Sequence, residues 1–404
     1  MRSLPGLDFD AFVRAMSGPA SVSIKLNRRK CTDPAETGYT SEESVKWCGS
    51  GYYLAERPKF TLNPLMHGGA FYVQDASSMI YETIVDRLIA DHGLSESALT
   101  LDMCAAPGGK TTSMINSLGD GATVIANEIM PQRAKALREN LLKWGFPRIM
   151  ATSNDTSRFA RCGEAFDLIA VDAPCSGEGM MRKEEMAVSQ WSPGLVKQCA
   201  ALQREILENA VAALRPGGFL VYSTCTFNRH EDEENVEWLI EQRGLESVDL
   251  NLPEEWDIGT QIGSPYPAMR FMPHITRGEG LFAAVFRKPG DAPATNHEKA
   301  RDMVRKNCKV ILDGIPTVTA KGKIEIPASE WALSTDFLKD RFPRAELDTE
   351  TALSYLRHEA IRLGSETPKG FVVVTYKGHP LGFVKNIGNR ANNLYPAEWR
   401  IRNL

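Results

Sequence analysis

The chain has 404 residues, enough for two or three domains, and its 43% hydrophobic and 24% charged residues are typical of globular proteins. No apolar run approaches the roughly 20 residues of a membrane helix, and residues 1–5 lack the apolar core of a signal peptide. We therefore expect a cytoplasmic protein with no membrane partner. The formal charge of −4 excludes a general polyanion-binding surface, so any contact with nucleic acid must be local.

The cysteines and histidines do not predict a metal site. The eight cysteines are scattered without a CxxC pair, and none of the seven histidines falls in a ligand-like pattern. We expect reduced thiols and no bound metal.

The first 75 residues are expected to form a small α+β domain. Residues 22–26 alternate like a strand and are followed by a polar, basic run at 27–30 (NRRK). Residues 45–54 form an aromatic stretch interrupted by glycine. Ser77 begins a predicted helix, in which apolar residues recur near helical spacing.

From about residue 98 the sequence alternates between strand and helix patterns, which predicts an α/β domain with a parallel sheet. The expected strands are residues 98–104, 122–129, 149–155, 166–174, 217–224 and 280–288. A run of acids at 231–234 (EDEE) predicts the first turn of a helix, where the helix dipole favours negative charge.

The remaining sequence predicts a linker and a smaller unit. Residues 288–296 are rich in proline, glycine and polar residues, and two strand-like runs farther on flank a hairpin signal at 377–380 (KGHP). The expected divisions are an N-terminal domain (1–75), a catalytic domain (76–289), a linker and intermediate region (290–349) and a C-terminal domain (350–404).

A glycine-rich turn at 104–110 (CAAPGGK) follows the first strand of the predicted sheet and precedes a helix. Glycine lets a ligand approach the backbone, and a helix N-terminus favours an anion. Glu128 ends the next strand 20 positions after Gly108, the usual separation for a carboxylate that binds ribose hydroxyls. Asp155 and Asp172 end the next two strands, and this row of acids fits an adenosine moiety.

A P-loop NTPase is the main alternative for this turn. The residues Gly109-Lys110-Thr111 resemble the end of its phosphate-binding loop. That loop needs glycine where this chain has Cys104, and Pro107 lacks a backbone donor that the phosphate would use. The nucleoside-binding interpretation is therefore favoured.

Two cysteines follow neighbouring strands of the predicted sheet, Cys175 in DAPC and Cys225 in STCTF. Ligands of open α/β sheets bind outside the carboxyl ends of the strands, so both thiols, Asp172 and Lys110 are expected to converge on one cleft. Such a set suits covalent catalysis on an electron-poor ring that a thiolate must first attack. An isolated cysteine would instead predict a small buried apolar residue, and the spacing does not show which thiol attacks.

Three segments, 104–111, 172–179 and 223–227, resemble motifs I, IV and VI of the Sun-type RNA cytosine-C5 methyltransferases. Residues 74–79 (QDASSM) and 381–400 resemble the bacterial rRNA methyltransferase F branch of that family. The resemblance implies a class I, Rossmann-like sheet that binds S-adenosylmethionine, with a PUA-like RNA-binding region at the C-terminus. The cofactor contacts that it implies are Cys104, Ala105, Ala106, Pro107, Gly108, Gly109, Lys110, Glu128, Arg133, Asp155 and Asp172.

The resemblance also implies roles for the two thiols. In the RNA family the Thr-Cys thiol, here Cys225, attacks C6 of cytosine and the Pro-Cys thiol, here Cys175, serves product release, whereas DNA cytosine methyltransferases attack with the Pro-Cys thiol. Asp172 is expected to support N3 of the base as charge develops. Lys110 is expected to pair with the carboxylate of the cofactor, unless that carboxylate lies on helix donors.

The RNA-binding surface is expected in residues 350–404, which carry eight basic and four acidic residues. A basic cluster at 25–30 (Lys25, Arg28, Arg29 and Lys30) is the alternative surface, and Arg182 with Lys183 could hold a phosphate. We therefore expect a monomeric RNA cytosine-C5 methyltransferase that acts on small-subunit (16S) rRNA. The alternatives are a tRNA methyltransferase and a non-catalytic RNA-binding factor for ribosome assembly.

Overall fold

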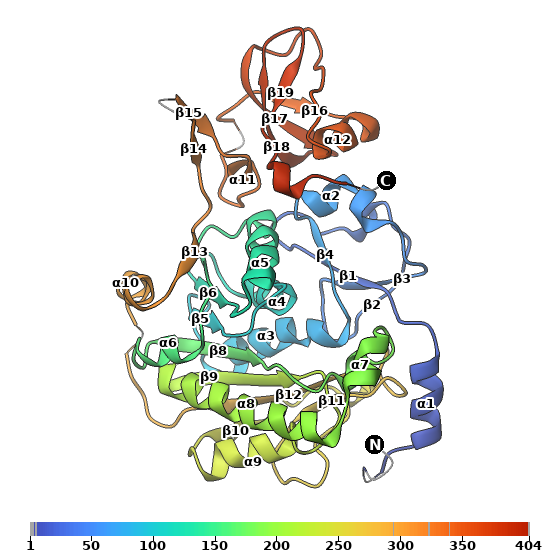
Figure 1. Cartoon of the computed structure of the whole chain (residues 1–404), viewed down its shortest axis with the longest axis vertical. Coiled ribbons are helices and arrows are strands. Elements are labelled where there is room, and N and C mark those ends of the chain that lie inside the picture. Colours follow the sequence, from blue (N-terminus) through green and yellow to red (C-terminus); the bar gives the residue numbers. More distant parts are fainter. Residues whose placement is uncertain (1–3, 5, 294, 322–323, 339, 403–404) are drawn as a thin grey trace.

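The computed structural model describes residues 4, 6–293, 295–321, 324–338 and 340–402. The signal-peptide expectation for residues 1–5 therefore lies mostly outside the described residues. A large α/β body carries the N-terminal domain along one side, and the C-terminal unit stands at one end of the molecule (Figure 1). None of the helices in the described ranges is long and apolar enough to cross a membrane.

The central sheet is of the doubly wound type, as the strand and helix alternation predicted. Its order is β10-β12-β9-β8-β5-β6-β7-β13, with β11 added beside β12. Strands β5 to β9 are parallel to one another, whereas β10, β11, β12 and β13 pair antiparallel. The strands are β5 (Leu99–Asp102), β6 (Thr123–Asn127), β7 (Ile149–Thr152), β8 (Phe166–Asp172), β9 (Leu214–Thr224), β10 (Glu246–Val248), β11 (Met269–Phe271), β12 (Leu281–Arg287) and β13 (Val310–Asp313).

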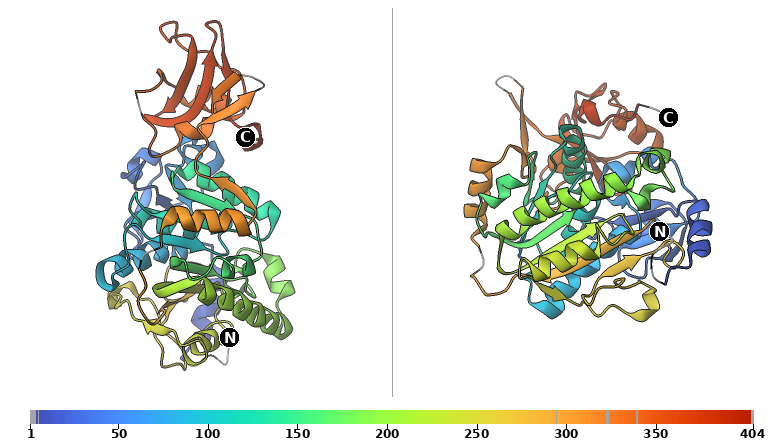
Figure 2. Two further views of the ribbon diagram at one scale, coloured as in Figure 1. Left: turned by 90° about the vertical axis from the view of Figure 1, so that its left-hand side faces the viewer. Right: turned by 60° about the horizontal axis from the view of Figure 1, so that its bottom comes forward.

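Helices cover both faces of this sheet, because side chains along each buried strand alternate between the faces. The core on one face includes apolar residues of α3 (Ile80–His92), α4 (Gly109–Ser117) and α5 (Pro131–Trp144). The opposite core includes residues of α8 (Pro193–Ala213) and α9 (Glu233–Glu241), seen in front of the sheet in Figure 1 and in the right-hand view of Figure 2. The sheet is thus buried on both sides, and ligands can reach it only at the strand ends.

The N-terminal domain begins with α1 (Phe9–Ser17) and contains a four-stranded antiparallel sheet in the order β2-β3-β1-β4. Its strands are β1 (Ser23–Leu26), β2 (Ser41–Ser44), β3 (Gly51–Leu54) and β4 (Phe71–Val73). A short helix, α2 (Pro64–His67), precedes β4. After β4 the chain turns through the 3₁₀ helix Ser77–Met79 into α3, so the helix predicted from Ser77 is confirmed. The N-terminal domain is therefore followed in the chain by α3, then by β5 and the glycine-rich turn.

The basic cluster at 25–30 lies largely in the interface between the N-terminal domain and the catalytic sheet. Lys25 is fully buried, and its Nζ donates to Gly109 O at 2.8 Å and to two hydroxyls of α4. Lys30 Nζ donates to two backbone carbonyls, and Arg28 pairs with the buried Glu82 at 2.5 Å. Burial lowers the pKa of both lysines to about 7. The structure does not support this cluster as an RNA surface, because its donors are used to dock the domain.

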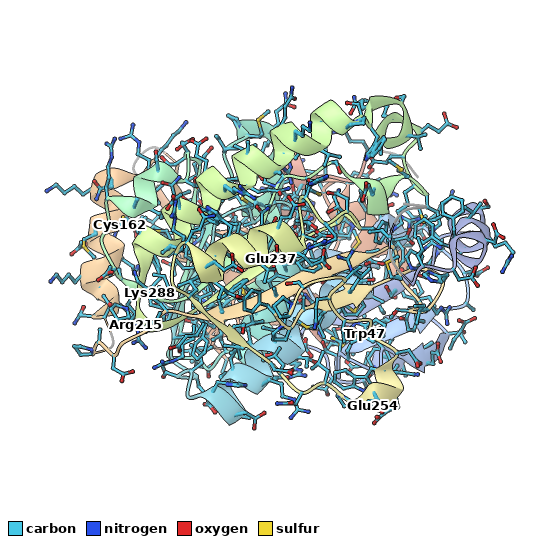
Figure 3. All side chains as sticks on the ribbon, turned by 90° about the horizontal axis from the view of Figure 1, so that it is seen from below. Trp47, Cys162, Arg215, Glu237, Glu254 and Lys288 are labelled. Atoms are coloured by element: carbon cyan, nitrogen blue, oxygen red, sulfur yellow. The ribbon has the colours of Figure 1, made fainter. Side chains whose placement is uncertain are left out.

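The described residues of the predicted linker, 288–296, form no helix or strand, and regular structure resumes after them. Helix α10 (His297–Asn307) packs on the catalytic core, and β13 pairs with β7 as an edge strand of the central sheet. Lys288 Nζ donates to the carbonyls of Val211 and Leu214, and Arg215 Nη1 donates to Ala292 O at 3.0 Å; Figure 3 shows Lys288 and Arg215 near each other. These contacts fasten the start of the region to the catalytic domain.

The C-terminal unit is built on a sheet in the order β16-β17-β18-β19. The strands are β16 (Arg344–Glu346), β17 (Gly370–Tyr376), β18 (His379–Asn386) and β19 (Ala391–Asn393), with α11 (Ser329–Ala332) and α12 (Thr349–Leu356) beside them. The hairpin predicted at 377–380 is confirmed, with positive φ at Lys377 and Gly378. Because β16 precedes residue 350, the sheet begins before the predicted boundary of this domain.

The C-terminal unit also contacts the N-terminal domain. His379 Nε2 lies 2.9 Å from Glu36 Oε2, and Tyr395 packs in the core that continues through α12 and the catalytic helices. Tyr395 OH lies 3.4 Å from Nδ1 of His67 in α2. Figure 1 shows the unit beside α2 and α5, with α8 and α9 toward the opposite end of the molecule.

Candidate active site

The two predicted cysteines lie side by side beyond the carboxyl ends of β8 and β9. These strands pair in parallel, with Asp172 opposite Ser223, so the loops that follow them start at the same level. The Sγ atoms of Cys175 and Cys225 are 3.0 Å apart, and both thiols are free and partly exposed. The predicted convergence of the thiols is confirmed by this geometry.

Asp172 is held by two side-chain donors. Lys110 Nζ, in the first turn of α4, lies 2.7 Å from one carboxylate oxygen, and Ser223 Oγ donates to the other at 2.7 Å. The single Ser223 proton is then used, so Tyr81 OH, 2.9 Å away, donates to Ser223 Oγ. Lys110 therefore pairs with Asp172 in this structure, and the carboxylate is fixed at the mouth of the cleft with its side chain 31% exposed.

The pKa values of Lys110 and Cys175 are both raised, so the lysine stays charged and the thiol stays neutral. Burial is the largest single influence on the pKa of Lys110 and acts to lower it, but the charge of Asp172, the hydrogen bond to it and the nearby Cys225 and Asp102 together raise the pKa, so the ammonium stays charged. The hydrogen bond to Cys225, together with burial, raises the pKa of Cys175 well above its usual value. The Cys175 thiol therefore keeps its proton and can donate it towards Cys225 Sγ.

A cavity of about 210 Å³ lies next to this group, between the glycine-rich turn and the N-terminal domain. Its lining is Tyr72, Val73, Gln74, Asp75, Ser78, Cys104, Ala105, Ala106, Pro107, Gly109, Lys110 and Asp172. The predicted turn and Asp172 supply one wall, and residues of β4 and of the segment after it supply the other. The sequence did not predict the second wall as part of the site, although Gln74, Asp75 and Ser78 of this wall lie in the QDASSM segment that resembles the F branch.

The glycine-rich turn is shaped for a close ligand. Gly108 has φ 110°, which favours glycine, and its peptide leads into the N-terminus of α4, where backbone donors face outward. Below the turn, Asp102 Oδ2 accepts from Thr111 Oγ1 at 2.6 Å, and burial raises the pKa of Asp102 to about 7. An adenosine-like ligand with an ammonium, a carboxylate and a sulfonium fits this donor set, because Lys110 and α4 offer positive ends and the strand-end acids offer acceptors.

Besides Gly108 in the turn itself, three predicted cofactor residues lie outside the cavity lining. Glu128 is buried after β6, accepts from Met130 N at 2.8 Å and pairs with Arg133 at 3.3 Å. Arg133 also donates to Ala106 O at 2.7 Å, which ties α5 to the turn. Asp155 is exposed after β7 and accepts from Ser157 N at 2.9 Å. All three stay on the predicted edge of the sheet, and their contacts with a cofactor remain predictions.

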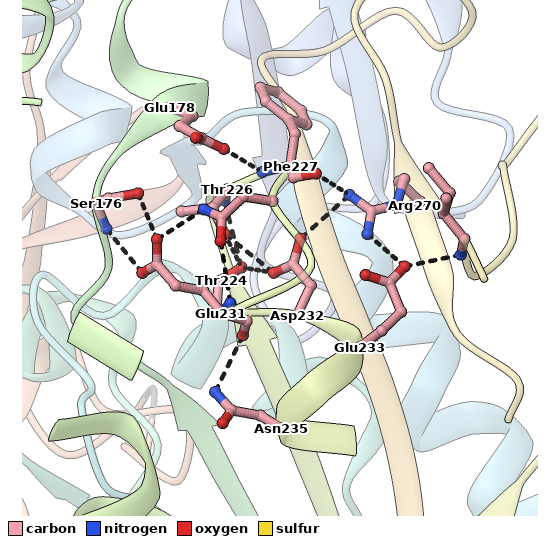
Figure 4. A network of polar contacts seen from close by, with 12 residues as sticks. Ser176, Glu178, Thr224, Thr226, Phe227, Glu231, Asp232, Glu233, Asn235 and Arg270 are labelled. Atoms are coloured by element: carbon pink, nitrogen blue, oxygen red, sulfur yellow. Dashed lines mark hydrogen bonds and ion pairs between the residues drawn. The ribbon is translucent and has the colours of Figure 1, made fainter. Parts of the chain in front are cut away.

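One prediction near the cleft needs correction. Arg182 does not present a free guanidinium to a phosphate, because it is buried against Glu279 at 2.7 Å and donates to Gly278 O at 2.8 Å. The acids at 231–234 were predicted as a first helical turn; Glu233 and Glu234 do lie in the first turn of α9, Glu231 and Asp232 precede it, and Glu231, Asp232 and Glu233 are fully buried. Figure 4 shows that they bond to residues flanking the thiol loops and to Arg270. Burial of acids cannot be seen in a charge run, since the partners are distant in sequence.

The comparisons with known proteins agree with this geometry. Residues 93–287 match the family described as 16S rRNA methyltransferase RsmB/F, residues 1–76 match the N-terminal domain of 16S rRNA methyltransferase RsmF, and residues 342–401 match the methyltransferase RsmF PUA domain. The ribosomal RNA small subunit methyltransferase F of Enterobacter sp. (strain 638) is 32% identical, over 97% of this chain and 92% of its own length. The chain belongs to the RsmF family of 16S rRNA methyltransferases.

Other relatives support the same assignment. The ribosomal RNA small subunit methyltransferase F of Klebsiella pneumoniae (strain 342) is 31% identical, over 97% of this chain and 93% of its own length. A methyltransferase homolog from Pyrococcus horikoshii is 26% identical, with a TM-score of 0.58 over 70% of this chain and 92% of that one. NSun6 from Pyrococcus horikoshii shares the fold at 20% identity, with a TM-score of 0.59 over 70% of this chain and 94% of that one. The resemblance to the F branch and the predicted methyltransferase fold are confirmed.

Proposed function

We propose that this protein transfers a methyl group from S-adenosylmethionine to C5 of a cytosine in 16S rRNA through a covalent bond between Cys225 and C6 of the base. The observation that carries the proposal is the paired thiols, 3.0 Å apart, beside the Lys110–Asp172 ion pair at the ends of adjacent strands. Membership of the RsmF family supplies the RNA and the methyl transfer.

The chemistry needs covalent help because C5 of cytosine is a poor nucleophile. Attack of the Cys225 thiolate at C6 breaks the conjugation of the ring and gives C5 the character of an enamine carbon, which can take the methyl group. The bound S-adenosylmethionine supplies that methyl group. C5 then loses its proton, and expulsion of the Cys225 thiolate restores the ring.

The surrounding residues have separate tasks in the proposed reaction. Asp172, fixed by Lys110 and Ser223, faces the base and supports N3 as charge develops. The Cys175 thiol, whose pKa is raised, can donate to Cys225 Sγ and so stabilise the departing thiolate. Cys104 to Lys110, Glu128, Arg133 and Asp155 would hold the adenosine and methionine parts of the cofactor. In this proposal no step uses a metal.

The proposed RNA contacts extend to the C-terminal unit. In residues 350–402 the exposed basic side chains without a carboxylate partner are Arg362, Lys369, Lys377, Lys385, Arg390, Arg400 and Arg402. Phosphate contacts from these residues would offset the roughly few kcal/mol needed to bring an unpaired or flipped cytosine into the cleft. We place the protein in the cytoplasm and expect it to act as a monomer.

A methylation assay on defined RNA tests the proposed function. Small subunits and naked 16S rRNA from a strain that lacks this gene would be incubated with the protein and radiolabelled S-adenosylmethionine, with tRNA as the comparison. Bisulfite sequencing then locates protected cytosines. We expect one or a few protected positions in 16S rRNA and none in tRNA. Label on tRNA alone, or label that bisulfite does not assign to a cytosine, would contradict the proposal.

A further inference from the structure

Consecutive acids at positions 231 and 232 lie under the two thiol loops without reaching solvent. Glu231 and Asp232 are each 0% exposed, and neither lines the cavity beside the glycine-rich turn. Only the next acid, Glu233, begins helix α9. Two buried carboxylates in succession need several donors each. The identity of those donors shows what the acids hold in place.

Glu231 fixes both neighbours of Cys175. Its carboxylate accepts from Ser176 N at 2.9 Å and also from Ser176 Oγ. Gln203 Nε2, on α8, donates to Glu231 at 2.8 Å and to Pro174 O at 3.0 Å, so one amide joins the acid to the residue before Cys175. The backbone on either side of the Cys175 thiol is therefore tied to one carboxylate.

Asp232 fixes both neighbours of Cys225. Its Oδ1 accepts from Thr224 Oγ1 at 2.6 Å and from Thr226 Oγ1 at 3.0 Å (Figure 4). The other carboxylate oxygen lies 3.1 Å from Arg270 Nη1, which also donates to Phe227 O at 3.0 Å. The residue before and the residue after the Cys225 thiol thus share one acceptor.

Two further contacts join the loops directly. Phe227 N donates to Glu178 Oε2 at 2.7 Å, and Gly179 N donates to Cys225 O at 2.8 Å. A Cβ on Gly179 would lie 3.0 Å from Cys225 O, so the two backbones are at the limit of close approach. The loops cannot move independently while these contacts and the acids hold them.

We propose that Glu231 and Asp232 are positioning residues that set the separation of the Cys175 and Cys225 thiols, Glu231 for the release thiol and Asp232 for the attacking thiol. The inference rests on the proposed function. Because the acids follow one another in the chain, a fixed local backbone links the two thiol loops. Neither acid touches substrate, so each acts through the cysteine whose neighbours it holds. A thiol displaced by about 1 Å would lose on the order of 100-fold in rate.

This arrangement predicts a different defect for each acid. Glu231→Ala loosens the Cys175 side, so attack proceeds while release slows, and a protein–RNA adduct accumulates. Asp232→Ala loosens the Cys225 side, so the adduct forms slowly and does not accumulate. Glu233→Ala is the control for the loss of a buried acid: Glu233 shares Arg270 with Asp232 and bonds to Ile262 N, but it bonds to no residue beside either cysteine. Ser176→Ala and Thr226→Val are milder variants that remove one donor to each acid without removing a buried charge.

The experiment measures methyl transfer to small subunits and adduct on a denaturing gel, with melting temperature and cofactor affinity as controls for folding. We expect an adduct to accumulate in Glu231→Ala and Ser176→Ala. In Asp232→Ala and Thr226→Val we expect no adduct and a loss of turnover of about tenfold or more. KM for RNA should stay unchanged. A common defect in all variants, the Glu233→Ala control included, would overturn the inference and assign the cluster to stability alone.

A second measurement does not depend on RNA. Diamide, which takes two electrons and two protons from two thiols as it becomes a hydrazine, should close a disulfide between Cys175 and Cys225 in the native protein. We expect the disulfide to form about tenfold more slowly in the Glu231 and Asp232 variants and at the native rate in Glu233→Ala. Mass spectrometry of peptides measures the rate of disulfide formation. Equal rates in all proteins would overturn the inference. Failure of the native protein to methylate RNA would instead overturn the proposed function and leave this result valid.

Discussion

The carboxylate of a single residue, Asp102, is buried beneath the glycine-rich turn. One oxygen accepts from Thr111, and the other oxygen has no hydrogen-bond partner in the structure. Burial raises the pKa of Asp102 to about 7. The folded protein therefore binds a proton there at pH values where the unfolded chain has released it.

This pKa predicts a pH dependence of stability. As pH rises from about 4 to about 7, ionisation of Asp102 costs more in the folded than in the unfolded state, so the free energy of unfolding falls by up to about 4 kcal/mol. Asp102→Asn should lack this decline while other groups titrate as before. Thermal melts of both proteins across this range measure the difference. Parallel pH profiles would contradict the burial of an ionisable Asp102.

The carboxylate of a second single residue, Glu128, is expected to bind the ribose of the cofactor. Glu128→Ala should raise the Kd for S-adenosylmethionine about tenfold, the effect of losing a hydrogen bond to a charged acceptor. Isothermal calorimetry measures it, with Asp120→Ala as control, because the Asp120 side chain is 95% exposed on the same domain. An unchanged Kd for Glu128→Ala would remove Glu128 from the cofactor site.

At the scale of elements, the strand ends were predictable and the buried polar contacts were not. Strands β5 to β9 each carry a local apolar run that ends in a chemically distinctive residue, so Lys110, Asp172, Cys175 and Cys225 could be placed at one edge. The prediction for Lys25 was wrong because a charged side chain is usually exposed to solvent, whereas the acceptors of Lys25 lie on α4, 84 to 88 positions away in the sequence. No local pattern encodes such partners, and the same holds for Glu231 with Ser176.

The docking role of the basic cluster can be tested with one variant. Lys25→Met removes the ammonium that bonds to Gly109 O and α4, so buried acceptors lose their donor and stability should fall by about 1–3 kcal/mol. The salt dependence of RNA binding should not change. Denaturant unfolding and filter binding measure the two effects, with the exposed Lys59→Met as control. A reduced salt slope in Lys25→Met would return this cluster to the RNA surface.

At the scale of the whole molecule, we expect the arrangement of the three units to determine where the RNA binds. The C-terminal unit is basic and touches the N-terminal domain, which supplies one wall of the cavity beside the glycine-rich turn. A truncation at residue 300 would remove β13 from the central sheet, so point variants separate RNA binding from folding better. The exposed basic side chains of the C-terminal unit are the suitable positions.

Replacing Lys369, Lys377, Lys385 and Arg390 by glutamine should weaken RNA binding. Each lost phosphate contact should reduce the slope of log K against log salt by roughly 0.7 to 0.9. Cofactor affinity should not change, because none of these residues lines the cavity beside the glycine-rich turn. Replacing Lys299 and Lys306 on α10 is the control on the catalytic body. An unchanged slope in the fourfold variant would place the RNA elsewhere.

The most direct test of the whole account separates the two thiols. Cys225→Ala and Cys175→Ala would each be mixed with S-adenosylmethionine and the small subunits of a strain lacking the gene, then examined on a denaturing gel. We predict no adduct and no methyl transfer for Cys225→Ala, a trapped protein–RNA adduct for Cys175→Ala, and no adduct for the double variant. An adduct in Cys225→Ala that disappears in the double variant would make Cys175 the nucleophile and contradict the account.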